Sequence, residues 1–186
     1  MRVIAGAAKG HQLKAPRGSR VRPTSDLVRG AIFSMLEAAD VEWDRVLDLY
    51  AGTGAMGIEA LSRGSEWLDA VEQDPRNCTV IKENLEHTGF RPRAKVYCCP
   101  AEKALSFLNE GYDLVFADPP YADPDLPSLL QRLFSSKAVT PRSTVVIEHS
   151  RRRALEESYG GFRLMKELRH GDTRVSVYRF QESQEG

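Results

Sequence analysis

Short apolar segments alternate with amphipathic segments along the middle of the chain, and this alternation limits the fold more than any other feature of the sequence. The apolar segments have the length of buried strands, whereas the amphipathic ones carry apolar residues three or four positions apart, which is typical of helices. Repeated strand–helix units indicate a parallel sheet with helices on both faces. We expect strands at residues 46–50, 67–72, 95–99, 112–117 and 144–148, and helices at 57–62, 75–88, 101–108 and 126–134.

Both ends of the chain depart from this pattern. Near the start, Thr24 or Ser25 is a suitable N-cap for a helix over residues 27–39. Near the end, residues 163–169 and 174–180 alternate in polarity about a short turn. This alternation predicts an antiparallel hairpin at one edge of the sheet.

The 186-residue chain has 26 basic and 26 acidic residues, but its charge is unevenly distributed. Residues 1–30 carry seven Lys or Arg and one Asp, a balance of +6, so the remainder carries −6. We expect a basic β-hairpin arm over residues 1–22, turning near Gly10, and an α/β domain over residues 23–182. The charge of the arm favours a polyanionic partner. A solvated N-terminus without a ligand would have the same charge.

The composition excludes several other classes of protein. No apolar run approaches the roughly 20 residues of a membrane span, and the start of the chain lacks the apolar region of a secretory signal. The three cysteines are too few for a disulfide framework, and neither they nor the four histidines have the spacing of metal ligands. We therefore expect a cytoplasmic, monomeric protein with no metal and no membrane partner.

A glycine-rich segment, Asp48-Leu49-Tyr50-Ala51-Gly52-Thr53-Gly54, follows the first expected strand of the sheet. Glycines at such a turn let a ligand approach the backbone closely, although helix–strand packing alone would also favour them. Glu72, at the end of the next strand, is placed to accept hydrogen bonds from two ribose hydroxyls. The glycine spacing also occurs in dinucleotide-binding proteins. Asp48, however, favours a cationic ligand over a pyrophosphate.

Asp118-Pro119-Pro120-Tyr121 stands at the C-terminal end of the expected fourth strand, where ligands bind in open α/β sheets. The prolines remove two N–H donors and leave carbonyl groups without local partners. The Asp118 carboxylate and the Pro119 carbonyl can each accept one N–H of an exocyclic base amine, which directs the amine lone pair at an electrophilic methyl group. Tyr121 offers a ring on which the base stacks. We expect these four residues to be catalytic.

The motifs DLYAGTG, VEQD and DPPY, in this order, resemble those of class I S-adenosylmethionine-dependent methyltransferases that act on exocyclic amines of bases. RPTSDLVRGAIFSML and HGDTRVSVYRF are similar to segments of the bacterial 16S rRNA guanine-N2 methyltransferase family, and the resemblance covers residues 2–180. It implies a Rossmann-like class I methyltransferase fold with a seven-stranded, mostly parallel sheet whose last strand is antiparallel. It also implies S-adenosylmethionine as cofactor and, as substrate, a guanine of 16S rRNA in the assembled or partly assembled 30S subunit.

The same resemblance implies the cofactor-binding residues, which are Asp48, Tyr50, Ala51, Gly52, Gly54, Glu72, Gln73, Ala101 and Glu102. Asp48 and the two glycines would hold the methionine end, Glu72 the ribose, and the Ala101 backbone the adenine. Pro100 stands where many of these enzymes carry Asp or Asn toward the adenine amine. Glu102 is the available substitute.

Substrate RNA is expected to contact the basic residues near the N-terminus, which are Arg2, Lys9, Lys14, Arg17, Arg20, Arg22 and Arg29. Arg29 is expected to face the active-site mouth or the RNA. Three consecutive arginines, at residues 151–153, are either a second RNA contact or a solvated loop.

Three other functions stay open at this point. An adenine-N6 methyltransferase acting on DNA or RNA would use the same motif at residues 118–121, although 186 residues leave little room for a separate sequence-reading domain. An NAD-dependent oxidoreductase would leave that motif without a role. A non-catalytic RNA-binding module would need neither Asp118 nor the glycines.

Overall fold

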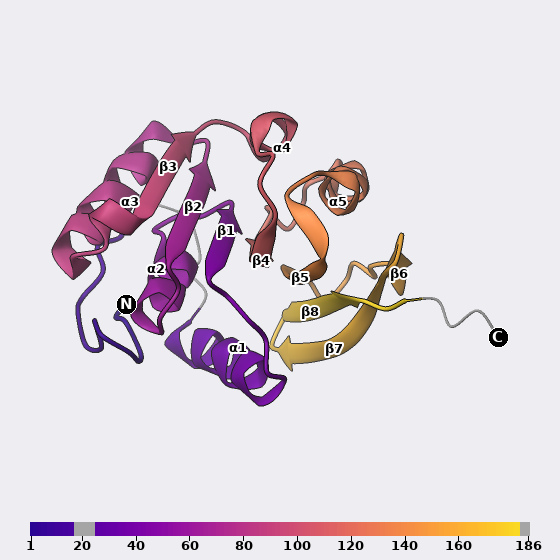
Figure 1. The fold of residues 1–186 in the computed structure, drawn as a ribbon, viewed down its shortest axis with the longest axis horizontal. Coiled ribbons are helices and arrows are strands. Elements are labelled where there is room, and N and C mark those ends of the chain that lie inside the picture. The colour runs from indigo at the N-terminus through magenta and orange to yellow at the C-terminus, as the bar shows by residue number, and fades with distance from the viewer. Residues whose placement is uncertain (17–24, 183–186) are drawn as a thin grey trace.

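Eight strands form one mixed sheet in the computed structural model, which describes residues 1–16 and 25–182 (Figure 1). The strands are β1 (Arg45–Leu49), β2 (Trp67–Glu72), β3 (Ala94–Cys98), β4 (Tyr112–Ala117), β5 (Val139–Ser150), β6 (Ser158–Tyr159), β7 (Phe162–His170) and β8 (Thr173–Phe180). Their order across the sheet is β3-β2-β1-β4-β5-β8-β7-β6. The first five in this order are parallel, and the pairs β5–β8, β8–β7 and β7–β6 are antiparallel.

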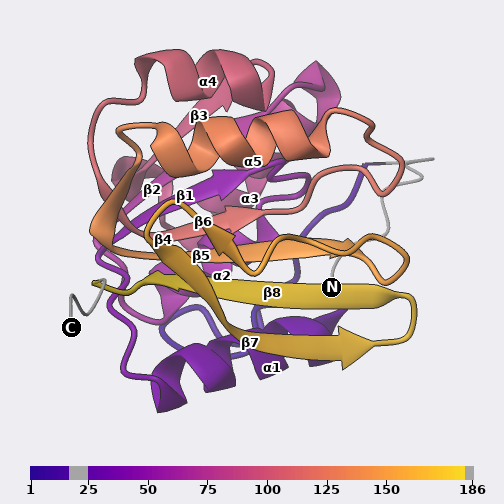
Figure 2. The ribbon, with the colours of Figure 1, turned by 90° about the vertical axis from the view of Figure 1, so that its right-hand side faces the viewer.

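Helices in the described residues cover both faces of this sheet (Figure 2). They are α1 (Asp26–Ala38), α2 (Ala55–Ser62), α3 (Pro75–Thr88), α4 (Ala101–Phe107) and α5 (Leu126–Ser135), with a short 3-10 helix, η1 (Arg91–Arg93), before β3. Apolar side chains of α1, α2 and α3 are buried on one face, and those of α4 and α5 on the other. The predicted Rossmann-like α/β architecture is confirmed.

Local sequence signals explain where the helices begin and end. α3 follows Asp74, whose side chain caps its first turn, and it ends at Gly89, which has a φ of +77°. α1 follows Ser25, whose hydroxyl accepts a hydrogen bond from the Val28 amide at 3.3 Å. Thr24, the alternative N-cap, lies outside the described residues.

Apart from shifts of one or two residues at strand ends, the sheet differs from the predicted one in two places. β5 begins at Val139 instead of Thr144, because Val139 already pairs with Tyr112 of β4 before the register shifts. The two-residue strand β6 is added to the seven strands predicted, because the chain folds back on the start of β7. β8, the last strand, is antiparallel to both of its neighbours, as expected.

The first 14 residues pack on the domain instead of projecting from it. Arg2 and Gln12 form an antiparallel bridge, and the Val3 amide donates to the His11 carbonyl at 3.0 Å. Apolar residues of this segment join the cluster that α1, α2 and α3 bury, and they are Val3, Ala8 and Leu13. The packed segment therefore belongs to the core of the domain.

Gly6 allows this segment to approach α2 closely. Its φ is +83°, and a Cβ at this position would lie 1.8 Å from the Ser62 carbonyl oxygen. The Ala8 amide donates to Ser62 Oγ at 2.9 Å. Only glycine fits between these backbones. Residues 17–22 of the predicted arm lie outside the described residues.

Candidate active site

The C-terminal ends of β1, β4 and β5 lie side by side at one edge of the sheet, because Leu49 pairs with Ala117 and Ala117 with Ile147. Figure 2 shows the segments that follow β4 and β5, and the turn between β7 and β8, together at this edge. A pocket opens among these strand ends and the loop between β1 and α2. Its position is the one where open α/β sheets bind ligands.

The loop between β1 and α2 has the backbone conformation of a tight ligand-binding turn. Gly52 has a φ of +57° and Gly54 a φ of +80°. Gly54 also caps α2, and a Cβ there would lie 3.1 Å from Ile81 Cγ2. Tyr50 has a φ of +60°, an uncommon conformation for a bulky residue that is found mostly at functional sites.

Asp48 places a buried carboxylate at the floor of the pocket. Its Oδ2 accepts a hydrogen bond from the Gly57 amide, in the first turn of α2, at 3.1 Å. Burial raises the pKa of Asp48 to about 7, and the negative charge of Glu72 also favours protonation, while the Gly57 hydrogen bond opposes it. A cationic ligand would stabilise the ionised carboxylate.

Glu72, at the end of β2, is held by two backbone amides. Its Oε2 accepts from Gly52 at 2.9 Å, and its Oε1 accepts from Asp74 at 2.8 Å. Each carboxylate oxygen has further lone pairs, so these contacts leave acceptor capacity for a ligand. The carboxylate is fixed at the rim of the glycine loop.

Asp118 follows β4 and faces the same pocket as Asp48. Burial raises the pKa of Asp118 well above its usual value, and the negative charges of Glu148 and Asp48 raise it further. The three pocket carboxylates therefore repel one another in their ionised forms. Such a pocket favours a cation, or hydrogen-bond donors, over an anionic ligand.

Two contacts tie the loop after Asp118 to neighbouring segments of the same edge. The Tyr121 hydroxyl forms a hydrogen bond with the Thr173 hydroxyl at the start of β8. An Arg153 guanidinium nitrogen donates to the Asp123 carbonyl. The Tyr121 side chain remains 43% exposed, which leaves its ring accessible to a stacking partner.

The pocket brings together five of the predicted site residues, which are Asp48, Tyr50, Ala51, Gly52 and Asp118. The other predicted residues lie outside its lining, and they are Gly54, Glu72, Gln73, Ala101, Glu102, Pro119, Pro120 and Tyr121. The hydroxyl of Tyr50, a lining residue, lies close enough to Glu102, one of the residues outside the lining, to be affected by its charge. It is buried without a hydrogen-bond partner among the described residues, and burial, followed by the negative charges of Glu102 and Asp123, raises its pKa.

Sequence reasoning missed part of the lining, namely Ile32, Thr53, Ala55, Met56, Phe116, Ala117, Val146 and Glu148. Most of these are apolar or small residues with no chemical signature. Glu148 is the exception, because it stands at the end of the predicted fifth strand as Asp118 stands after the fourth. Comparing the residues at the ends of the predicted strands would have identified Glu148.

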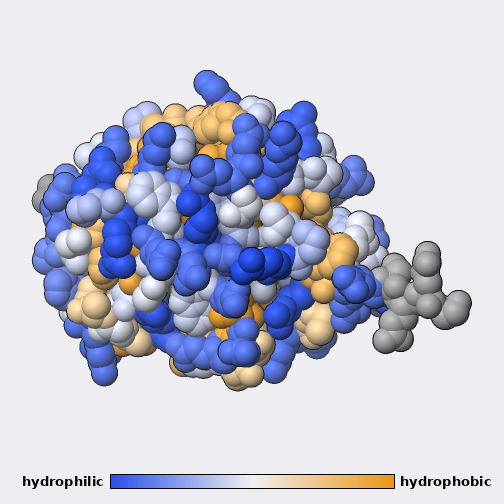
Figure 3. Space-filling model, in the orientation of Figure 1, coloured by the Kyte–Doolittle hydropathy of each residue, from blue (hydrophilic) through white to orange (hydrophobic). Residues whose placement is uncertain are grey.

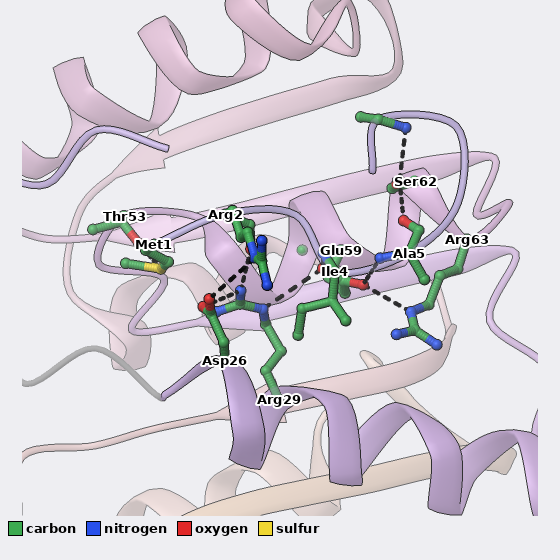
Figure 4. A network of polar contacts seen from close by, with 12 residues as sticks. Met1, Arg2, Ile4, Ala5, Asp26, Arg29, Thr53, Glu59, Ser62 and Arg63 are labelled. Atoms are coloured by element: carbon green, nitrogen blue, oxygen red, sulfur yellow. Dashed lines mark hydrogen bonds and ion pairs between the residues drawn. The ribbon is translucent and has the colours of Figure 1, made fainter. Parts of the chain in front are cut away.

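The prediction that Arg29 faces RNA or the pocket mouth is wrong. Its side chain is completely buried between α1, α2 and the N-terminal segment (Figure 4). One terminal guanidinium nitrogen donates to the Arg2 carbonyl and to Asp26 at 2.9 Å, and Nε lies 3.6 Å from Glu59 Oε2. Glu59 also accepts from the Ile4 amide at 2.9 Å. Arg29 holds the N-terminal segment in place.

The other basic residues of the N-terminal segment differ in their surroundings. Arg2 lies 3.9 Å from Asp26 with its side chain 67% exposed, and Lys14 pairs with Glu83 at 2.9 Å with its side chain 68% exposed. Lys9 is exposed. Three predicted RNA contacts lie outside the described residues, namely Arg17, Arg20 and Arg22.

The surface is largely hydrophilic on the face shown in Figure 3, where apolar residues are scattered among polar ones. Within residues 1–16 and 25–182, no helix is long and apolar enough to cross a bilayer. The same ranges contain no group of three His, Cys, Asp or Glu side chains that could hold a metal ion.

The chain is similar to proteins of several bacteria over almost its whole length. It is 37% identical over 182 residues to the Bacillus subtilis protein named "Putative rRNA methyltransferase YlbH", covering 96% of this chain and 98% of that one. It is 28% identical over 178 residues to "Ribosomal RNA small subunit methyltransferase D" of Escherichia coli, covering 96% and 89% of the two chains. The solved structure titled "Putative methyltransferase yhhF from Escherichia coli" superposes with a TM-score of 0.85 at 27% identity, covering 97% and 98%.

A family model described as "Conserved hypothetical protein 95" matches residues 1–179. The match includes the glycine loop, the Asp118 motif and the packed N-terminal segment in one unit. The chain therefore belongs to this family, and the resemblance predicted from its motifs is confirmed at the level of the family.

Proposed function

We propose that the protein transfers a methyl group from S-adenosylmethionine to the N2 amine of a guanine in 16S rRNA of the small ribosomal subunit. The observation that carries this proposal is the shared pocket of Asp118 and the glycine loop. The names of its relatives, which refer to rRNA methylation, favour RNA as the substrate class.

The residues present fit the proposed cofactor. Its sulfonium and ammonium groups are cationic, and the pocket presents the buried carboxyl group of Asp48, whose pKa is raised by burial. We assign the methionine end to Asp48, Gly52 and Gly54, and the ribose to the Glu72 carboxylate. Tyr50 lines the pocket, and its buried hydroxyl has no hydrogen-bond partner among the described residues.

The adenine is assigned to the start of α4, where Ala101 is buried and Glu102 partly exposed. Gln73 is exposed beside Glu72 and lies at the same edge of the sheet. These assignments extend the site from the glycine loop toward β3 and rest on the resemblance of motifs.

The chemistry requires an acceptor for the amine and an electrophile beside it. When bound, the cofactor supplies a methyl group on a positively charged sulfur, which keeps the electron pair of the broken bond as the amine nitrogen bonds to the methyl carbon. The Asp118 carboxylate and the Pro119 carbonyl hold the two N–H groups and so aim the lone pair. Asp118 then accepts the proton that the methylated nitrogen releases, for which its raised pKa is suited.

The target base must leave its stack in the RNA to reach this pocket, which costs a few kcal/mol. Stacking on an aromatic ring contributes about 1–3 kcal/mol and offsets part of that cost. We assign this role to Tyr121, whose ring is partly exposed beside the pocket and whose hydroxyl is held by Thr173.

Incubation with labelled S-adenosylmethionine tests the proposal. Unmodified 30S subunits, naked 16S rRNA and duplex DNA serve as parallel substrates, and the modified nucleoside is then identified. We expect N2-methylguanosine from the subunit or the rRNA. N6-methyladenine as the only product, or no transfer to any of the three, would overturn the proposal.

A further inference from the structure

Glu148 lies beside Asp118 in the pocket, and the chemistry proposed above gives it no role. Ala117 of β4 pairs with Ile147 of β5, so the two carboxylates occupy equivalent positions one residue further along. Neighbouring strands are about 4.8 Å apart. Both side chains line the pocket, and the charge of Glu148 contributes to the raised pKa of Asp118.

A pair of neighbouring acceptors matches one base better than another. The Watson–Crick edge of guanine carries two adjacent donors, the N1–H and the N2 amine. That of adenine carries the N6 amine beside N1, which presents a lone pair. Bases turned out of their stacks are read by hydrogen bonds on this edge.

We infer that Glu148 accepts a hydrogen bond from N1–H of the target guanine while Asp118 holds its N2 amine, and that Glu148 thereby selects guanine over adenine. This inference rests on the proposed function and names the residue that sets its base specificity. An adenine bound through its amine at Asp118 would turn its N1 lone pair toward the Glu148 carboxylate. Two acceptors facing each other in a partly buried site are strongly unfavourable.

The surroundings of Glu148 hold its strand end in place. The next residue, His149, is buried, and its Nε2 lies 2.8 Å from Ser176 Oγ on β8. Its Nδ1 lies 3.1 Å from the Ser150 carbonyl oxygen. β5 is therefore fixed on both sides of the pocket end, by β4 and by β8, so that Glu148 projects from a rigid support.

The experiment compares guanosine with 2-aminopurine at the methylated position of 16S rRNA. 2-Aminopurine keeps the 2-amino group but presents a lone pair at N1. The wild-type protein should strongly prefer guanosine. In Glu148→Gln the side-chain amide can donate to that lone pair, so the ratio of kcat/KM for guanosine to that for 2-aminopurine should fall roughly 10- to 100-fold. The missing O6 of 2-aminopurine affects both proteins equally and cancels in this comparison.

Two controls separate base recognition from other roles. Glu42→Gln makes the same chemical change on a side chain that is 70% exposed and pairs with Arg142 near the start of β5, and it should leave the ratio unchanged. Calorimetry with S-adenosylmethionine should give the same affinity for Glu148→Gln as for the wild-type protein. A loss of cofactor affinity with an unchanged ratio would assign Glu148 to the cofactor and overturn the inference.

If Glu148→Gln does not fold, Glu148→Asp is the second variant to measure. It keeps a charged acceptor, so it should lower the overall rate and still prefer guanosine. If the wild-type protein methylates both bases equally well, the inference is wrong whatever the variants do. If the wild-type protein forms no N2-methylguanosine at all, the proposed function fails instead.

Discussion

The Gly52 amide donates a hydrogen bond to Glu72 Oε2 over 2.9 Å, which joins the loop after β1 to the end of β2. The other carboxylate oxygen, Oε1, accepts from the Asp74 amide at 2.8 Å. Both acceptors are therefore oriented before a ligand arrives. A preorganised acceptor saves the ligand the entropy of ordering it.

Glu72→Ala should weaken cofactor binding about 10- to 100-fold, because it removes both the ribose acceptor and a support of the glycine loop. Isothermal calorimetry with S-adenosylmethionine measures this loss. Glu66→Ala, at an exposed position just before β2, is the matched control and should bind normally. Normal binding by the Glu72 variant would exclude Glu72 from the cofactor site.

Asp118→Ala should lower methyl transfer by about 100-fold or more, because the amine loses its charged acceptor at the reacting centre. Cofactor affinity should change little, since Asp118 contacts the substrate in our assignment. Single-turnover transfer and calorimetry measure the two quantities separately. A parallel loss of both would place Asp118 in the cofactor site instead.

Asp118→Ala should also be more stable than the wild-type protein at pH 8. The pKa of Asp118 is higher in the folded than in the unfolded protein. At any pH above the unfolded-state pKa of 3.8, this carboxyl group therefore lowers the free energy of unfolding. Alanine removes that cost. Urea unfolding at pH 8 should show a higher midpoint for Asp118→Ala, and a lower one would show that the carboxylate stabilises the fold.

Asp48 should make cofactor affinity depend on pH. Its folded-state pKa is raised from 3.8 to about 7, so its contribution to folding stability is largest below pH 4 and is lost as pH rises through about 7. A bound cation favours the ionised form, so the free protein must release a proton on binding when the pH is below about 7. Affinity should therefore rise as the pH increases toward about 7, by at most about tenfold per unit, and should level off above it.

Calorimetry at several pH values, in buffers of different ionisation enthalpy, counts the released proton directly. Asp48→Asn should bind more weakly and flatten the pH dependence over this range. The same slope in the variant would assign the titration to another group of the pocket.

The sequence predicted the elements with clear local signals and missed features that depend on distant partners. Residues 75–88 and 112–117 form α3 and β4 with the predicted bounds, because a cap, a glycine or a continuous apolar run marks their ends. The early start of β5 depends on pairing with Tyr112, which no local pattern indicates. The sequence around Arg29 is typical of a surface cation, and its burial depends on contacts with distant residues, the Arg2 carbonyl and the Glu59 carboxylate.

The order of the chemical motifs predicted that Asp48 and Asp118 lie close together, since both stand near the ends of strands in a parallel sheet, and the structure places both in one pocket. The buried contacts between the N-terminal segment and α2 were not predictable, because they involve backbone groups and common side chains such as Ser62. The basic composition of this segment favoured an arm, and its buried apolar residues, Val3, Ala8 and Leu13, are five positions apart and so follow neither the strand nor the helix period.

Glu59→Gln should destabilise the fold by about 1–3 kcal/mol, because it removes the buried carboxylate shared by the Arg29 and Arg63 guanidiniums, while Arg29 keeps Asp26 as an acidic partner. Glu59 and Arg29 are both fully buried, and Glu59 also pairs with Arg63 at 2.9 Å. Urea unfolding monitored by circular dichroism measures the loss. Glu37→Gln removes only the exposed partner of Arg63 and should cost less than about 1 kcal/mol. Equal effects of the two variants would show that the buried pair contributes little.

Replacing Arg17, Arg20 and Arg22 by Ala should weaken binding to 30S subunits and lower the slope of log affinity against log salt by up to about 2–3. This variant is preferable to deleting the whole arm, because deletion would also remove the buried Val3 and Leu13 and so change stability.

The matched control removes three exposed cations away from the pocket edge, and they are Arg132, Lys137 and Arg142. Lys137 and Arg142 flank the start of β5, at the opposite end of that strand from the pocket. The control should leave the slope unchanged, because counterion release depends on the cations that contact phosphates. If the two triple variants lower the slope equally, the effect comes from net charge, and the basic segment makes no specific contact with the RNA.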